Sequence, residues 1–265
     1  MREKWNETAQ VISQECLSEG IYSLWLKTEN IAGAARPGQF VSLYCQDTSH
    51  LLPRPISICE VGEDSLRLVY RVAGWGTHEF SQLKAGDSVR VTGPLGNGFP
   101  LERAAGKKAV LMGGGIGVPP MLQLAKSLQA LEGEATPAAV TAVLGYRNAD
   151  TFLGEAFEKA AQLKVASEDG SVGTKGNVLD CMREQQIEAE VIFACGPMPM
   201  LRAIKAYAAE RQIECWLSLE EKMACGIGAC LSCVCRTSEK DAHSQVDNAR
   251  ICTEGPVFEA GSIEI

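Results

Sequence analysis

The hydrophobic periodicity of the chain changes near residue 101, and this change restricts the possible folds more than any other feature. Before it, short segments such as 21–26 and 65–70 alternate apolar and polar residues with a period of two. Turns that contain Gly or Pro separate these segments. Many short strands with such turns predict a small antiparallel β-barrel over residues 1–100.

After residue 101, buried-strand patterns at 109–112, 140–144 and 191–194 alternate with helix patterns at 119–131 and 199–211. This alternation predicts a parallel sheet with right-handed crossovers. From about residue 215 the chain is rich in Cys and Gly and has no long periodic element. We therefore expect a multidomain α+β and α/β protein with domains at 1–100, 101–214 and 215–265.

The composition excludes several classes of protein. Hydrophobic residues make up 46% and charged residues 22% of the chain, as in ordinary soluble proteins. No apolar stretch approaches the roughly 18 residues of a membrane span, and the chain start lacks the apolar core of a signal peptide. We expect a cytoplasmic protein. The net charge of −8 argues against a nucleic-acid partner.

Four of the eleven cysteines cluster toward the C-terminus with the spacing C-x4-C-x2-C and one remote member. They are Cys225, Cys230, Cys233 and Cys252. This spacing matches the plant-type ferredoxin arrangement for a [2Fe-2S] cluster. Gly226 and Gly228 give the loop the backbone freedom to wrap around a cluster, and their amides are candidate donors to its sulfurs.

A structural zinc site is the alternative for these cysteines. Zinc sites usually contain two close C-x2-C-like pairs, whereas here three ligands fall within nine residues and the fourth is remote. The spacing favours the cluster. Cys235 is a spare candidate ligand, but it lies only two residues after Cys233.

Two glycine-containing turns follow predicted strands and open predicted helices. The first spans residues 113–120, where Gly114, Gly115 and Gly117 would let a diphosphate approach the backbone at a helix N-terminus. The second contains Cys195 and Gly196. Two such strand ends would flank one nicotinamide. Tight turns without a ligand, and a Cys195 that only fills space, are the alternatives.

These motifs together resemble the ferredoxin-reductase superfamily, which pairs a FAD-binding barrel with an NAD(P)-binding α/β domain. The flavin signature Arg-Pro-x-Ser of that superfamily is present as Arg54, Pro55, Ile56 and Ser57. The resemblance implies that Arg54 neutralises the FAD diphosphate and that Ser57 lies near the flavin N5. A second segment, 70–77, is similar to the strand and loop that close over the flavin. Its implied contacts are Tyr70, Arg71, Val72, Gly76 and Thr77.

Residues 220–230 and 251–258 resemble, more narrowly, the electron-transfer subunits of NAD-dependent (class 1B) dihydroorotate dehydrogenases. This resemblance implies that the four clustered cysteines ligate the [2Fe-2S] cluster. It also implies an FMN-containing catalytic subunit as partner, in a heterotetramer of two copies of each chain. That partner oxidises dihydroorotate to orotate in pyrimidine biosynthesis. Electrons would pass from the cluster to FAD and then to NAD, and no residue of this chain would be a catalytic acid or base.

Two other functions remain open at this stage. One is the flavin and iron-sulfur subunit of another NAD(P)H-linked oxidoreductase, such as a ferredoxin:NADP oxidoreductase or a sulfite or sulfur reductase. Some of those relatives carry aspartate at the first cluster position, where this chain has Cys225. The other is a redox sensor. Glu168 and Asp169 follow the third strand of the nucleotide domain and favour NAD over NADP, although Arg147 lies near the preceding strand end.

Overall fold

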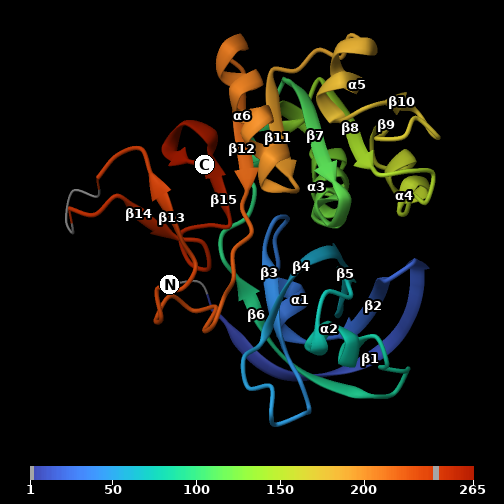
Figure 1. The fold of residues 1–265 in the computed structure, drawn as a ribbon, viewed down its shortest axis with the longest axis vertical. Helices are drawn as coiled ribbons and strands as arrows, with labels where there is room; N and C mark the ends of the chain where they lie inside the picture. The colour runs from blue at the N-terminus through green and yellow to red at the C-terminus, as the bar shows by residue number, and fades with distance from the viewer. Residues whose placement is uncertain (1–2, 241–244) are drawn as a thin grey trace.

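The computed structural model describes residues 3–240 and 245–265. Met1, Arg2 and residues 241–244, among them the first two residues of the chain start discussed above, lie outside this description. Figure 1 shows a blue to cyan barrel, a sheet covered by helices above it, and an orange to red C-terminal segment that runs along both. None of the described helices is long and apolar enough to cross a membrane.

The N-terminal part is a closed barrel of six antiparallel strands in the order β1-β2-β5-β4-β3-β6. The strands are β1 (Trp5–Ser18), β2 (Ile21–Lys27), β3 (Phe40–Tyr44), β4 (Arg54–Val61), β5 (Ser65–Arg71) and β6 (Ser88–Leu95). Two short helices, α1 (Asn30–Ala34) and α2 (Trp75–Phe80), lie in its connections. Alternate side chains such as Leu24, Leu66 and Leu68 fill the interior and are fully buried. The predicted barrel is confirmed.

A seven-stranded sheet in the order β10-β9-β8-β7-β11-β12-β15 forms the second part. Its strands are β7 (Lys108–Gly114), β8 (Ala139–Tyr146), β9 (Gln162–Ser167), β10 (Thr174–Lys175), β11 (Val191–Cys195), β12 (Glu214–Ser218) and β15 (Val257–Glu259). The first six strands in that order run parallel, and β15 pairs antiparallel with β12. The predicted parallel sheet is confirmed, and its antiparallel edge comes from the C-terminal segment.

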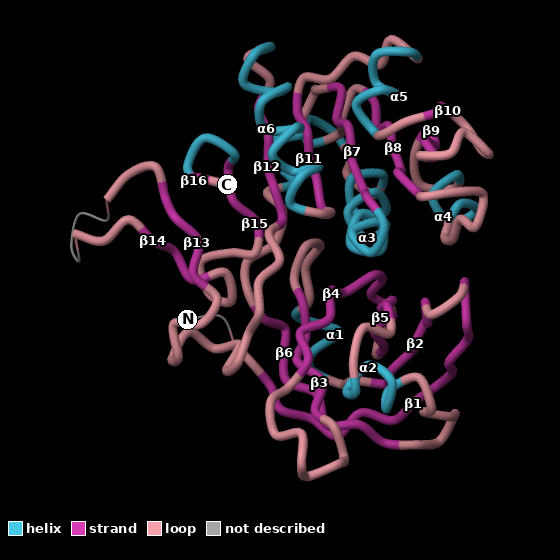
Figure 2. Tube along the Cα trace, in the orientation of Figure 1, coloured by secondary structure: helices cyan, strands magenta, loops and turns pink. Residues whose placement is uncertain are grey.

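Helices cover both faces of this sheet (Figure 2). They are α3 (Val118–Gln129), α4 (Gly154–Glu158), α5 (Val178–Glu184) and α6 (Met198–Arg211). Short 3-10 turns lie at Leu101–Ala104, Gly115–Gly117, Gly133–Ala135 and Ala260–Ser262. Alternate residues of β7 face opposite cores: Leu111 packs with α3 and α4, and Met112 with α5 and α6. Because α3 also contacts β4, it joins the sheet to the barrel.

The cysteine-rich segment lies between β12 and a three-stranded sheet of β14 (Asn248–Arg250), β13 (Val234–Thr237) and β16 (Ile263–Glu264). After β14 the chain passes to the larger sheet as β15 and then returns to the three-stranded sheet as β16. The predicted division at residues 214 and 215 falls within β12, and the three domain ranges stay a prediction.

A buried carboxylate holds the barrel against α3. Glu60 in β4 is only 7% exposed and accepts a hydrogen bond of 2.6 Å from Nη1 of Arg67 in β5. It also accepts one from Nζ of Lys126 in α3. Burial alone would raise the pKa of Glu60, but Lys126 and Arg67 outweigh it and hold the pKa below its ordinary value of 4.5. One charged carboxylate therefore pairs with cations from both parts.

Replacing Glu60 by Gln should lower the free energy of unfolding by about 2–3 kcal/mol at pH 7, measured by urea denaturation. The matched control is Glu15→Gln. Glu15 pairs with the same Arg67 at 3.3 Å, but its side chain is 61% exposed. Loss of such an exposed pair costs less than about 1 kcal/mol. An equal loss of unfolding free energy in the two variants would contradict the claim that the buried ion pairs of Glu60 hold the barrel against α3.

The effect of Glu60→Gln should also depend on pH. Because the pKa of Glu60 is lower in the folded chain, its ionised form contributes stability that is full above pH 4.5. That contribution is lost as the pH falls through the folded pKa. Wild type and Glu60→Gln should therefore converge in stability below pH 4.5. A difference that stays constant down to low pH would show that the carboxylate charge is not its cause.

Candidate functional site

A cavity of about 310 Å³ opens where the barrel, the parallel sheet and the C-terminal segment meet. The barrel lines it with β4 and β5, and the sheet lines it with Ile116 after β7 and Ser218 at the end of β12. The C-terminal segment adds Met223 and Pro256. A molecule in this cavity would therefore touch all three parts of the chain.

The strand β4 presents alternate residues to the barrel interior and to the cavity. Ile56 and Ile58 pack in the barrel core, whereas Pro55 and Ser57 are half-buried on the outer side and line the cavity. The sequence-predicted Ser57 thus lies at the cavity wall, where its hydroxyl is available to a flat ring.

Arg54, the first residue of β4, lies against α2. A Cβ added to Gly76 would come within 2.6 Å of Nε of Arg54, so only glycine lets the guanidinium approach the helix this closely. Thr77 accepts the amide hydrogens of Ala73 at 2.9 Å and Gly74 at 3.2 Å, and so fixes the loop before α2. The structure therefore brings the predicted Arg54, Gly76 and Thr77 together.

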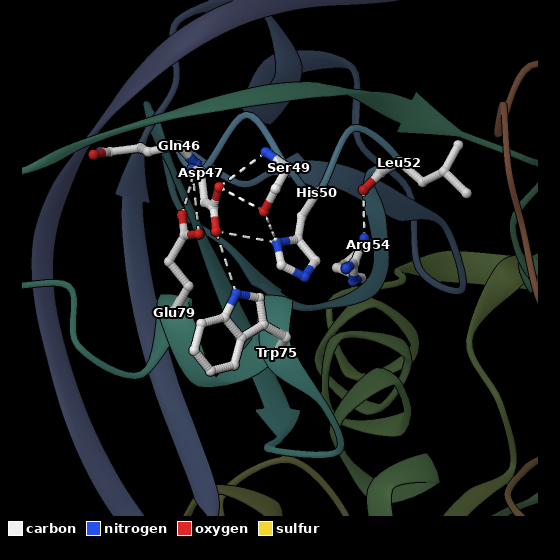
Figure 3. A network of polar contacts seen from close by, with 8 residues as sticks. All are labelled: Gln46, Asp47, Ser49, His50, Leu52, Arg54, Trp75 and Glu79. Carbon is white, nitrogen blue, oxygen red and sulfur yellow. Dashed lines mark hydrogen bonds and ion pairs between the residues drawn. The ribbon is translucent and has the colours of Figure 1, made fainter.

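A polar network orders the loop that precedes Arg54 (Figure 3). Asp47 accepts hydrogen bonds from the backbone and hydroxyl of Ser49, at 2.9 and 2.8 Å, and from Nε1 of Trp75 at 3.4 Å. Glu79 of α2 accepts the amide of Gln46 at 2.6 Å. The Ser49 donors and Trp75 hold the pKa of Asp47 well below its usual range. These contacts tie the loop to α2 and fix the approach of Arg54.

The remaining predicted flavin contacts differ in orientation. The ring of Tyr70 is 1% exposed in the barrel core, and its hydroxyl donates to Oε1 of Gln14 at 3.0 Å. The hydroxyl of Tyr70 is therefore engaged by Gln14, although the residue also lines the cavity. Arg71, one residue on, faces outward and lines the cavity. Val72 donates its amide to the carbonyl of Gly20 at 2.8 Å, which anchors the end of β5.

The two glycine-containing turns lie in contact at neighbouring strand ends. β7 and β11 are adjacent, and Gly113 is the register partner of Cys195. A Cβ on Gly117 would lie 2.3 Å from the carbonyl oxygen of Cys195, and one on Gly114 would lie 2.4 Å from Sδ of Met200. Gly115 has a φ of 54°, and a Cβ added to it would lie 3.5 Å from Nη2 of Arg71. Together with Gly196, which is also buried, these residues form one backbone-lined site.

Cys195 is 1% exposed, and burial, with the charge of Glu220 adding to it, raises the pKa of its thiol far above the ordinary value. Such an environment disfavours the thiolate form of Cys195. Glu220 was not a predicted site residue. Glu220 lines the cavity. The surrounding protein desolvates its carboxyl group and raises the pKa of that group, and the positive charge of Arg71 partly offsets this rise. Its position just after β12 parallels the turns after β7 and β11.

The four clustered cysteines lie as two pairs. The thiol of Cys225 contacts that of Cys230, and the thiol of Cys252 contacts that of Cys233. Within residues 3–240 and 245–265, no three His, Cys, Asp or Glu side chains are gathered as the ligands of one metal ion would be. Two pairs fit a [2Fe-2S] cluster, in which each iron takes two thiolates.

Backbone amides point at the first pair. The amide of Ile227 lies 3.5 Å from Sγ of Cys225. Burial alone would raise the pKa of Cys225, but the amides of Ile227, Cys230 and Ala229 lower it to about 6. The loop can present these amides because Gly226 and Gly228 adopt φ angles of 67° and 88°. An environment that stabilises thiolate also suits a metal-bound sulfur.

The backbone of Glu168 and Asp169, after β9, pairs with the backbone at the end of β8, next to Arg147. The amide of Glu168 donates to the carbonyl of Tyr146 at 3.1 Å, and that of Asp169 to the carbonyl of Arg147 at 3.3 Å. Asp169 accepts from the hydroxyl of Ser171 at 2.6 Å, and these Ser171 contacts lower its pKa. The strand end therefore keeps negative charge at neutral pH, which disfavours a 2′-phosphate.

Comparison with known proteins gives matches over nearly the whole chain. The family model of the iron-sulfur cluster binding domain of dihydroorotate dehydrogenase B matches residues 220–264. The model of the oxidoreductase NAD-binding domain matches residues 111–206. These ranges contain the cysteine pairs and both glycine-containing turns.

Individual relatives extend this similarity. The electron transfer subunit of dihydroorotate dehydrogenase B (NAD(+)) from Bacillus caldolyticus is 41% identical over 97% of this chain and 98% of its own length. That from Listeria monocytogenes is 42% identical over 97% and 98%. A chain in the structure of an NADH-dependent reduced ferredoxin-NADP oxidoreductase is 29% identical, with a TM-score of 0.85 over 97% of this chain and 90% of that chain.

Replacing Gly117 by Ala should weaken NADH binding about tenfold, as measured by calorimetric titration. The added Cβ would lie 2.3 Å from the carbonyl oxygen of Cys195, and the two turns must separate. Overpacking of this kind costs about 1–3 kcal/mol, and each 1.4 kcal/mol is a factor of about ten. Gly33→Ala is the control, because its Cβ meets nothing within 4 Å. An unchanged affinity of Gly117→Ala for NADH would show that the two turns do not form the NADH-binding site.

Proposed function

The chain belongs to the family of electron transfer subunits of dihydroorotate dehydrogenase B, and from this premise we propose how its residues carry electrons between a [2Fe-2S] cluster, FAD and NAD. The observation that carries the proposal is the single cavity bordered by the barrel, the sheet and the cysteine segment. Met223 and Pro256 line that cavity, and they lie two residues before Cys225 and four after Cys252. A flavin in the cavity would be close to both the nucleotide turns and the cluster ligands.

In this arrangement the barrel holds FAD. Arg54 would neutralise its diphosphate beside Gly76, and Ser57 would lie beside its ring near N5. Arg71 extends from the same wall toward Gly115. When bound, the flavin supplies both two-electron exchange with a nicotinamide and one-electron exchange with a cluster.

The sheet holds NAD at the ends of β7 and β11. Gly114, Gly115 and Gly117 bring backbone amides to the pyrophosphate, and Gly196 leaves room beside them. Cys195 contributes a neutral, buried wall to the nicotinamide side. No side chain acts as an acid or base on a substrate. The chain orients the rings, excludes water and neutralises phosphate charge.

Cys225, Cys230, Cys233 and Cys252 hold the cluster as two pairs. Cys230 is exposed, and so a cluster held by these cysteines would have one of its ligands at the protein surface. Such a position suits exchange of electrons with a second protein. We therefore also propose that the partner is the FMN-containing catalytic subunit that oxidises dihydroorotate, in a heterotetramer of two copies of each chain.

The surface around the cluster loop supports a protein partner. Ile227, Leu231 and Val234 are 52%, 61% and 38% exposed. Apolar side chains around an exposed ligand are typical of an interface core. Free cysteines at all eleven positions are consistent with work in the reducing cytoplasm. The alternative, a subunit of another NAD(P)H-linked oxidoreductase, is less favoured, because the chain from the reduced ferredoxin-NADP oxidoreductase structure is 29% identical, against 41–42% for the two dihydroorotate dehydrogenase subunits.

Replacing Cys230 by Ser should remove the cluster and leave the flavin. Wild type should contain one FAD and about two irons with acid-labile sulfide per chain. The variant should lose the irons and keep its NADH-dependent diaphorase rate within about twofold, because the flavin contacts lie on the barrel. Cys235→Ser is the control and should retain both irons. One zinc per chain in the wild type, or equal loss in both variants, would refute the ligand assignment.

Reconstitution with the FMN-containing catalytic subunit tests the proposed partner. The complex should reduce NAD when dihydroorotate is added, and the isolated chain should not. Leu231→Glu places a charge in the proposed interface and should weaken assembly by about tenfold or more. Ile12→Glu, on a barrel strand, is the control because Ile12 is also 48% exposed. Equal assembly of both variants would place the interface elsewhere, and no assembly of the wild type would favour the alternative oxidoreductase.

A further inference from the structure

Asn97, in the connection from the barrel to the parallel sheet, binds the segment that follows the last cysteine. Its Nδ2 donates to the carbonyl oxygens of Glu254 and Val257, both at 2.8 Å. Its Oδ1 accepts the amide hydrogen of Val257 at 3.0 Å. Its own amide donates to the carbonyl of Gly255 at 2.6 Å. Both amide donors and one acceptor position of the side chain are used, so the contact fixes orientation as well as distance.

The same segment is packed closely on two sides. Gly96 has a φ of 74°, and a Cβ added there would lie 2.5 Å from Cδ of Pro256 and 2.7 Å from the carbonyl oxygen of Gly255. On the other side, the amide of Leu219 donates to the carbonyl of Pro256 at 2.9 Å. Pro256 is therefore held between the barrel connection and the end of β12.

This segment joins the cluster ligands to the cavity wall. Pro256 lines the cavity, and Cys252 lies four residues before it. Glu254 accepts hydrogen bonds from the backbone of Arg250 at 2.6 Å and from its Nε at 3.0 Å. Nη1 of Arg250 reaches the carbonyl of Gly228 in the ligand loop at 3.4 Å. A shift of residues 254–257 would consequently move Cys252 and the ligand loop relative to the barrel strands β4 and β5 that line the cavity.

The ligand loop rests on the barrel in a second place. A Cβ added to Gly226 would lie 3.0 Å from Oγ of Ser42 in β3 and 3.5 Å from Cδ1 of Leu95 in β6. Leu95 directly precedes the connection that carries Asn97. The ligand loop around Gly226 and the 254–257 segment therefore both pack against the same end of β6, next to the proposed flavin-binding face of the barrel.

We propose that Asn97 is a positioning residue that sets the separation between the flavin and the iron-sulfur cluster. This inference rests on the proposed function, because it takes the cavity as the flavin site and the four cysteines as ligands. Electron transfer slows steeply as two centres move apart, and small displacements of reacting groups have large effects on rate. Exchange between NADH and the flavin depends on the turns after β7 and β11 and should not depend on Asn97.

The test follows both steps in the full chain after rapid mixing with NADH. Asn97→Asp keeps the size and the acceptor for Val257, but a carboxylate oxygen replaces the donor and faces the carbonyls of Glu254 and Val257. The flavin should bleach at the wild-type rate within about twofold, and cluster reduction should slow about tenfold or more. Asn30→Asp makes the same change at an exposed site on α1 and should leave both steps unchanged.

Gly96→Ala is the second variant, because its Cβ displaces Pro256 from the neighbouring position without any change in charge. It should give the same selective slowing, so a misfolded Asn97→Asp would not end the test. Hydrogen–deuterium exchange supplies a readout that needs no turnover. Peptides that cover 250–258 should exchange faster in both variants, and those that cover β7 should not change.

The outcomes separate this role from a general structural one. Selective slowing of cluster reduction, with two irons retained and faster exchange at 250–258, supports the proposal. Equal slowing of both steps, loss of iron, or unchanged cluster reduction overturns it. A wild-type chain that binds no FAD or no cluster would overturn the proposed function as well, and this result is read from the wild type alone.

Discussion

The site depends on the contact between the carboxyl ends of β7, β11 and β12 and the outer face of the barrel. Ligands of parallel sheets bind at these strand ends, and here a second wall faces them. The backbone of Gly117 packs on the carbonyl of Cys195, and Ser218 ends the next strand. The ion pairs of Glu60 hold α3, and with it the glycine turn, against β4. The cavity exists because these two surfaces are fixed at a set separation.

Local patterns were sufficient to predict the parts of this arrangement. Period-two alternation gave the barrel, and alternating strand and helix patterns gave the parallel sheet, both confirmed by the structure and its relatives. The cysteine spacing and the Arg-Pro-x-Ser signature pointed to the family to which the chain belongs. These signals can be recognised in the sequence because each depends on residues close together in the chain. Strand alternation depends on the pleat, helix periodicity on the helical turn, and the cysteine spacing on one loop that wraps a cluster.

Contacts between distant residues could not be predicted in this way. β15 has three residues, too few for a periodic signal, yet it completes the sheet beside β12. The contacts of Asn97 span up to 160 residues in sequence. For Tyr70, the alternation of inward and outward residues along the strand already predicted the direction of the side chain. Tyr70 shares the strand parity of Leu66 and Leu68, which point into the barrel, and so its ring packs in the barrel core and its hydroxyl donates to Gln14.

In this account the flavin is the obligatory centre between the nicotinamide and the cluster, because the cavity is lined by Ile116 of the first glycine-containing turn and by Met223 and Pro256, which lie close in sequence to the cysteine ligands. The most direct test is to strip FAD from the chain, keep its cluster, add NADH anaerobically and follow the cluster by its absorption and its paramagnetic signal. The cluster should stay oxidised until FAD is restored. Reduction by NADH at the same rate without FAD would contradict the account.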